Sequence, residues 1–174
     1  NLFYSIVKSA VDAAKPFGVP VTIKMRIGID EEHQTYFTAA KAAADAGVSW
    51  VALHARYASQ LYEGEADWSA IAKLVEFMEG TNVPVLGNGD IWSGADGVRM
   101  MEETGCAGVV VGRGCLGRPW LFKDLVNAFN GENTKVTPTL FEVRDIMKRH
   151  AILLTEFFEQ EGRAMRDLQI GRAH

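Results

Sequence analysis

Apolar and polar residues alternate in a repeating order along most of the chain. Between Val19 and Ile27 apolar residues occupy every second position, which predicts a strand with one buried face. Residues 31–46 are rich in alanine and are followed by Gly47, which predicts a helix that ends there. The same order then recurs, with further strands expected at 50–56, 83–86 and 107–111 and further helices at 67–79, 94–103 and 118–129.

Repeating strand–helix units with strands this apolar predict an α/β fold in which helices cover a parallel sheet, as a barrel or a doubly wound sheet. Polar side chains at the carboxyl ends of the strands favour the barrel, because a TIM barrel builds its active site at that rim. They are Lys24, Arg26, His54, Arg56, Asn88, Asp90 and Arg113.

The third and fourth strands are followed by the glycine-rich loops 87–90 and 112–114. TIM (β/α)8 barrels often bind phosphate on the loops after their last two strands. Residues 1–129 are therefore expected to be the second half, about strands five to eight, of such a barrel. A complete barrel takes about 250 residues, so we expect the chain to be part of a longer protein.

A polar segment at 130–137 predicts a linker, and an amphipathic helix is expected from Pro138 onward. We interpret residues 138–174 as the truncated start of an α-helical domain. Six Lys or Arg and six Asp or Glu residues fall in this segment, so it carries no evident basic patch.

Composition narrows the class of protein. The chain has 174 residues, of which 48% are hydrophobic and 23% charged, which is typical of a globular domain. A net charge of −4 gives no general attraction to nucleic acid or anionic lipid. No membrane-spanning run or signal peptide is visible, and Cys106 and Cys115 have no CxxC spacing. We expect a reduced, cytoplasmic protein that binds neither membrane nor metal.

The segment GNGDIWSGAD, residues 87–96, is a candidate phosphate site. Glycine at 87 and 89 allows close approach of a ligand to the backbone, Asn88 offers hydrogen bonds, and the helix that starts near Ser93 would present free N–H groups to an anion. Asp90 has the wrong charge for phosphate, so we expect it to orient backbone groups or hydroxyls. Gly112 and Arg113 could form a second wall, although Gly-Arg-Gly alone is commonly only a turn.

Several motifs occur together in a fixed order. They are residues 20–30 (PVTIKMRIGID), 54–56 (HAR), 64–68 (GEADW), 84–91 (PVLGNGDI), and 111–114 (VGRG) with 117–120 (GRPW). From about residue 2 to about residue 168 the chain resembles bacterial tRNA-dihydrouridine synthases, a flavin-dependent family that reduces selected uridines in tRNA. Residues 169–174 do not resemble the continuation of that family.

The resemblance implies roles for the polar rim. It implies that FMN is bound by Lys24, His54, Asn88, Gly89, Asp90, Gly112 and Arg113, and that Arg26 and Arg56 face the uridine. Three of these residues have a simpler alternative: Lys24 as a solvated strand-end lysine, Arg26 as an ion-pair partner, and His54 as a core histidine. The catalytic cysteine of the family lies upstream of this region, so neither cysteine here is assigned that role.

The function implied by the resemblance is reduction of uridine to 5,6-dihydrouridine in tRNA, with NADPH or NADH reducing FMN. The helix after residue 138 would then begin a tRNA-binding domain. Two alternatives stay open. One is another phosphate-binding barrel enzyme, either a dihydroorotate-dehydrogenase-like flavoenzyme or a sugar-phosphate isomerase, although such isomerases usually need a carboxylate pair and only Asp90 is placed for one. The other is a non-catalytic half-barrel that binds a ligand or partner.

Overall fold

The computed structural model of the chain describes residues 2–132 and 134–160. Four parallel strands form one sheet in the order β1-β2-β3-β4, namely β1 (Ile23–Arg26), β2 (Val51–His54), β3 (Val85–Asn88) and β4 (Gly108–Val110). The register places Arg26 beside His54, His54 beside Asn88, and Asn88 beside Val110. The last residues of the four strands therefore form one row across the sheet.

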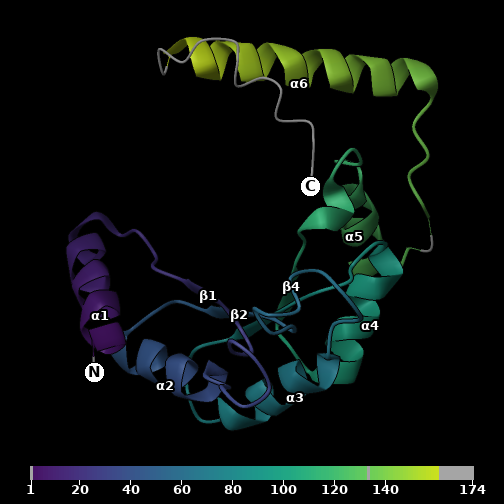
Figure 1. The fold of residues 1–174 in the computed structure, drawn as a ribbon. Coiled ribbons are helices and arrows are strands. Elements are labelled where there is room, and N and C mark those ends of the chain that lie inside the picture. Colours follow the sequence, from purple (N-terminus) through teal and green to yellow (C-terminus); the bar gives the residue numbers. More distant parts are fainter. Residues whose placement is uncertain (1, 133, 161–174) are drawn as a thin grey trace. The chain divides into compact units, whose positions relative to one another are not determined.

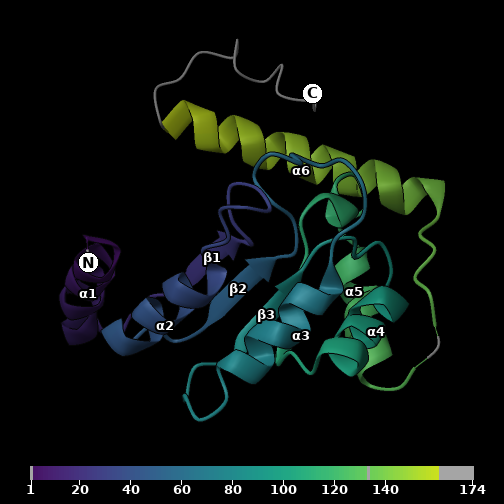
Figure 2. The same cartoon turned by 60° about the horizontal axis from the view of Figure 1, so that its bottom comes forward.

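Helices connect the strands and follow one face of the curved sheet (Figure 1). A view turned by 60° shows α2, α3 and α4 lying beside the strands (Figure 2). The described helices of this unit are α1 (Leu2–Ala14), α2 (Tyr36–Ala46), α3 (Trp68–Phe77), α4 (Gly94–Thr104) and α5 (Leu121–Phe129), with short 3-10 turns η1 (Lys15–Phe17) and η2 (Arg113–Cys115).

The core lies between the sheet and its helices. Strand β2 is buried along its whole length, and alanines of α2 pack closely against it. Ala40, Ala43, Leu53, Ile71 and Leu74 are all 0% exposed. Burial of this apolar surface stabilises the sheet and fixes the direction in which each strand end points. The predicted α/β class and parallel sheet are confirmed, and the arrangement is compatible with part of a TIM barrel.

Some predicted boundaries were wrong. The first strand is limited to Ile23–Arg26, because Val21 leaves the ladder and its carbonyl instead accepts a hydrogen bond from Ser49 N at 2.8 Å. The helix expected from residue 31 begins at Tyr36, since residues 28–34 form a hairpin-like loop closed by a bridge between Gly28 and Gln34. The third strand starts and ends two residues later than predicted, at Val85–Asn88. Helix α1 and turn η2 were not predicted.

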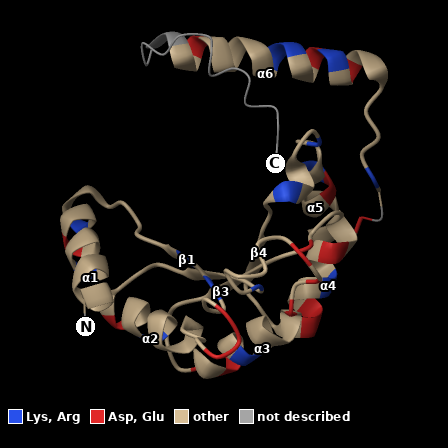
Figure 3. Cartoon of the chain, in the orientation of Figure 1, with Lys and Arg blue, Asp and Glu red and all other residues tan. Residues whose placement is uncertain are grey.

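The chain divides into two units, residues 1–135 and 136–174. Within the second unit, α6 (Leu140–Gln160) begins two residues after the predicted start. Its first turn is capped by Thr139 and Glu142, because Thr139 N donates to Glu142 Oε2 at 2.7 Å and Glu142 N donates to Thr139 Oγ1 at 3.3 Å. Acidic and basic residues are mixed along α6 (Figure 3). Among the described residues, no helix is both long and apolar enough to cross a bilayer.

Candidate functional site

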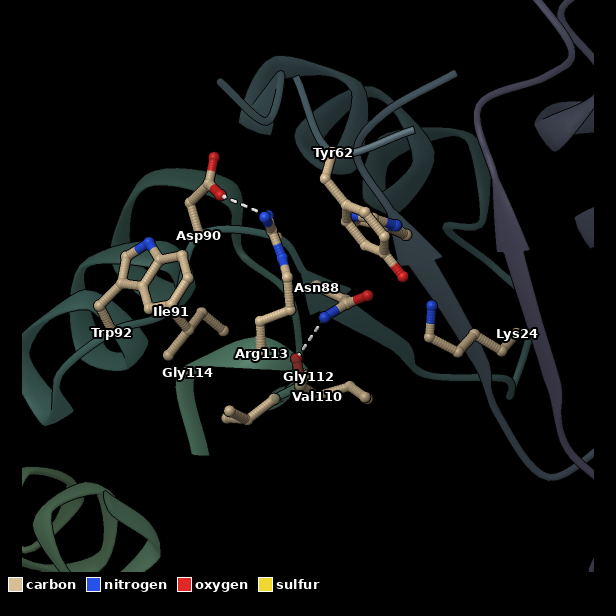
Figure 4. A pocket seen from close by; sticks show the side chains of 13 residues that line it. Lys24, Tyr62, Asn88, Asp90, Ile91, Trp92, Val110, Gly112, Arg113 and Gly114 are labelled. Atoms are coloured by element: carbon tan, nitrogen blue, oxygen red, sulfur yellow. Dashed lines mark hydrogen bonds and ion pairs between the residues drawn. The ribbon is translucent and has the colours of Figure 1, made fainter. Parts of the chain in front are cut away.

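A cavity of about 230 Å³ opens at the carboxyl ends of the strands. Residues from all four strand ends line it, together with Tyr62 from the β2–α3 loop (Figure 4). The lining includes every residue that the sequence assigned to a cofactor: Lys24, His54, Asn88, Gly89, Asp90, Gly112 and Arg113. The structure therefore brings these seven residues together, whereas Arg26 and Arg56 lie outside this cavity.

The turn between β3 and α4 requires its glycine. Gly89 has φ +132°, and a Cβ there would lie 2.6 Å from Cβ of Ala66. The Gly89 carbonyl accepts a hydrogen bond from Nε1 of Trp68 at 3.1 Å. Asn88 Nδ2 donates to the Val110 carbonyl at 2.6 Å, which ties the ends of β3 and β4 together. These two hydrogen bonds tie the corner to strand β4 and to Trp68.

Asp90 connects this corner to the β2–α3 loop. Its two carboxylate oxygens accept hydrogen bonds from Nη2 of Arg56 at 2.8 and 2.9 Å, and one also accepts from Ala66 N at 2.7 Å. Asp90 adopts φ +53°, a left-handed conformation that Asp tolerates better than most residues. Asp90 therefore holds the Ala66 amide, and its role beside a cofactor stays a prediction.

Arg56 is almost completely buried, with its side chain 1% exposed. It donates to the Glu63 carbonyl at 3.2 Å and to the Gly64 carbonyl at 2.6 Å, so it holds the β2–α3 loop as well as Asp90. Within the described part of the chain its Nη1 has no hydrogen-bond partner. The role expected for Arg56 at the uridine stays a prediction.

Arg26 holds the same loop from the other side. Its Nη1 donates to the carbonyls of Tyr57 at 2.7 Å and Leu61 at 3.0 Å. Two arginines from neighbouring strand ends therefore fix the loop by its backbone oxygens. The proposed contact of Arg26 with substrate also stays a prediction.

Arg113 lies between two aromatic rings. Its Cζ is 4.4 Å from the ring centroid of Tyr62 and 5.5 Å from that of Trp92, and its Nη2 is 3.6 Å from Oδ1 of Asp90. Tyr62 was missed by the sequence analysis, because a tyrosine in a polar loop carries no periodic signal. Its position two residues before the Gly-Glu-Ala-Asp-Trp motif was the available hint.

The cavity is electropositive around a neutral imidazole. Burial and, after it, repulsion from the nearby charges of Arg26, Lys24, Arg56 and Arg113 together lower the pKa of His54 from 6.5 to about 4. Burial, followed by repulsion from Arg26, also lowers the pKa of Lys24. At neutral pH His54 is therefore uncharged and can donate one hydrogen bond and accept another. A ligand that combines anionic and hydrogen-bonding groups suits this surface.

The start of α4 differs from the expected free anion site. The Asp96 side chain accepts from Trp92 N at 3.1 Å, and Asp96 N donates to Ser93 Oγ at 3.2 Å. This reciprocal cap supplies the first turn with a carboxylate of its own. An anion in the cavity is thus left to Arg113 and the glycine-rich backbone rather than to this helix end.

Neither cysteine lines the cavity. Cys106 is buried and its Sγ donates to the Gly108 carbonyl, whereas partly buried Cys115 donates to the Gly112 carbonyl. In the described ranges no cluster of three or more His, Cys, Asp or Glu residues is arranged to hold a metal ion.

Residues 1–169 match the family model described as dihydrouridine synthase (Dus). A protein of Mycobacterium tuberculosis (strain CDC 1551 / Oshkosh), named probable tRNA-dihydrouridine synthase, is 50% identical over 169 residues, which are 97% of this chain and 43% of the relative. Proteins of the same name from Treponema pallidum and Aquifex aeolicus are 46% and 36% identical, over 69% and 92% of this chain and 36% and 48% of their own lengths.

The chain spans less than half the length of these curated relatives. The family match nevertheless covers both the sheet and the cavity-lining residues. The chain belongs to the dihydrouridine synthase family.

Proposed function

We propose that this chain is part of an FMN-dependent enzyme that reduces specific uridines in tRNA to 5,6-dihydrouridine with NADPH or NADH. The observation that carries the proposal is the gathering of seven candidate cofactor residues around one cavity at the strand ends. Family membership supplies the reaction class, since the matched relatives are named as probable tRNA-dihydrouridine synthases.

The residues present fit a phosphate-bearing flavin. A Cβ added to Gly112 would meet no protein atom within 4 Å, so this glycine leaves open space on the cavity wall where a ligand can approach the backbone. Arg113, which is 35% exposed, can still reach a phosphate although its guanidinium is bracketed by aromatic rings. The electropositive surroundings favour a ligand with negative charge.

Each cavity residue has a proposed part. Arg113 would pair with the phosphate, and Asn88 would bind the ribityl chain through its side-chain oxygen. Lys24 would place positive charge beside the anionic edge of the ring, and His54, uncharged at neutral pH, would donate or accept a hydrogen bond there. FMN, when bound, would supply the hydride chemistry of the reaction. Gly89 and Asp90 would keep the corner in the shape that the ligand requires.

Arg26 and Arg56 are proposed to serve the uridine. Both hold the β2–α3 loop by its carbonyl groups, so they would fix the wall that the base approaches. A direct contact from Arg56 would use Nη1, the guanidinium nitrogen that has no partner among the described residues. Such a nitrogen would pair well with a uracil carbonyl.

The wider architecture is also a proposal. The cavity volume of about 230 Å³ is small beside the 300 Å³ or more typical of ligand sites, which agrees with one wall of a site that further strands complete. Residues 1–129 would be the second half of a TIM barrel, and residues 138–174 would begin a helical tRNA-binding domain in a cytoplasmic enzyme. The mixed charges of α6 do not single out a tRNA surface, so that assignment depends on family membership.

The isomerase alternative loses support from the cavity. Among the described lining residues Asp90 is the only carboxylate, and it is held by Arg56 and the Ala66 amide. A sugar-phosphate isomerase needs a carboxylate free to move a proton. The other alternative, a non-catalytic half-barrel, is distinguished from the flavoenzyme by the experiments below.

The first test is the visible absorption spectrum of the purified protein, before and after addition of FMN. The two bands of oxidised flavin are expected, and they should weaken when Arg113 is replaced by alanine. The second test is formation of dihydrouridine in an unmodified tRNA transcript, measured by mass spectrometry with FMN and NADPH present, and it uses the complete protein that contains this chain, because the catalytic cysteine implied by the resemblance lies upstream. A protein that stays colourless with added FMN would refute the flavoenzyme proposal and favour a non-catalytic binding module.

A further inference from the structure

Tyr62 is held over the cavity by contacts on both sides of it in the sequence. Before it, the Leu61 carbonyl accepts two hydrogen bonds from the guanidinium of Arg26, each 3.0 Å long. After it, the Glu63 and Gly64 carbonyls accept from Arg56 at 3.2 and 2.6 Å. The backbone on either side of Tyr62 is therefore fixed by arginines from the ends of β1 and β2.

The conformation of this loop is locally unfavourable. Leu61 has φ +51°, in the left-handed region that a residue with a branched side chain rarely adopts. Its side chain is 66% exposed, so burial of the leucine does not repay the strain. The hydrogen bonds from Arg26 to the Leu61 carbonyl hold this conformation. The conformation of Leu61 in turn sets the position of the next residue, Tyr62.

The Tyr62 ring meets the guanidinium of Arg113. The 4.4 Å between Cζ of Arg113 and the ring centroid is shorter than the 5.5 Å to Trp92, while the 3.6 Å to Asp90 is too long for a strong hydrogen bond. In Figure 4 Tyr62 extends into the cavity next to Arg113. Tyr62 is thus the nearer of the two aromatic rings beside this cation, which has only a long ion pair with Asp90.

We propose that Tyr62 is a positioning residue that fixes the guanidinium of Arg113 for the phosphate of the bound ligand and so gives the site its preference for FMN over riboflavin. This inference rests on the proposed function. The ring removes water from one side of the cation and restricts its rotamers before the ligand arrives. Less conformational entropy is then lost when the phosphate binds.

The test compares dissociation constants for FMN and riboflavin, measured by flavin fluorescence titration. The two ligands differ only in the phosphate, so the ratio of their constants reports on the phosphate contact alone. Tyr62→Leu is expected to weaken FMN binding roughly fivefold and to leave riboflavin binding within about twofold, as loss of one cation–π contact would do. Tyr62→Phe keeps the ring and is expected to keep the ratio. Phe17→Leu, at an exposed aromatic residue in η1, is the control variant.

The outcomes separate this inference from the proposed function. If Arg113→Ala abolishes the preference for FMN and Tyr62→Leu leaves it intact, the role of Tyr62 is refuted while the flavin site stands. Equal weakening of both ligands by Tyr62→Leu also refutes it, because a general structural role would act on both. If the unaltered protein binds neither flavin, the proposed function and this inference both fail. Tyr62 is 55% exposed, so the variants should fold; Tyr62→Gln, expected to behave as Tyr62→Leu, guards against an effect peculiar to leucine.

Discussion

Removing one partner of the ion pair between Asp90 and Arg56 is predicted to be among the most destabilising single changes near the cavity. Arg56 is 1% exposed and its Nη2 lies 2.8 and 2.9 Å from the two oxygens of Asp90, which is itself 22% exposed. Removing one partner of a buried pair costs about 3 to 5 kcal/mol, because the other charge is left without compensation. Asp90→Asn keeps an oxygen that can accept hydrogen bonds, and it tolerates the left-handed backbone, so we expect a loss of about 2 to 3 kcal/mol.

The measurement is the free energy of unfolding in urea, followed by circular dichroism without added ligand. A double-mutant cycle with Arg56→Met should make the double variant more stable than the sum of the single losses by about 2 kcal/mol. The exposed pair Lys41 and Asp45, with side chains 55% and 52% exposed, is the matched control and should couple by only about 0.5 kcal/mol. An Asp90–Arg56 coupling no larger than that of the control pair would refute the reasoning.

Three further predictions concern protonation, charge and packing. The pKa of His54 is lowered from 6.5 to about 4, so between these pH values the unfolded chain binds more protons than the folded one. The free energy of unfolding should therefore fall by up to about 3 kcal/mol as the pH drops from 6.5 to 4. His54→Gln should flatten this part of the pH profile, measured by urea unfolding. Lys24→Met should weaken FMN binding roughly tenfold in a fluorescence titration, with no such change for Lys41→Met. A Cβ at Gly94 would lie 2.5 Å from the carbonyl oxygen of Asp124, so Gly94→Ala should destabilise by about 2 kcal/mol or more in thermal unfolding, whereas Ala95→Gly, at an exposed position, should cost only about 1 kcal/mol.

The sequence carried enough information to predict the sheet and the cavity rim. Apolar strands that recur between helices require parallel pairing, and parallel strands bring their carboxyl ends to one edge. Lys24, His54, Asn88 and Arg113 could therefore be grouped without a structure. Their roles toward FMN stay predictions.

Contacts between loops could not be predicted in the same way. The hydrogen bonds of Arg26 and Arg56 end on carbonyl groups, which every residue has, so no pattern of side chains marks them. The place of Tyr62 depends on the positive φ of Leu61, which leucine rarely adopts and which local propensity therefore argues against. The late start of α2 has a similar cause. The alanine-rich composition predicts the helix, but it does not reveal the loop before the helix, which is closed by the bridge between Gly28 and Gln34.

The row formed by Arg26, His54, Asn88 and Val110 across the sheet makes the cavity sensitive to chain length. Side chains alternate between the faces of a strand, so deleting one residue from β2 would turn His54 away from the cavity and bring an alanine in its place. The turn between α3 and β3, around exposed Gly80, lies at the opposite ends of the strands and could gain residues without moving the row. Insertions and deletions should therefore be tolerated in the turns opposite the cavity, but not within the strands that lead to the cavity.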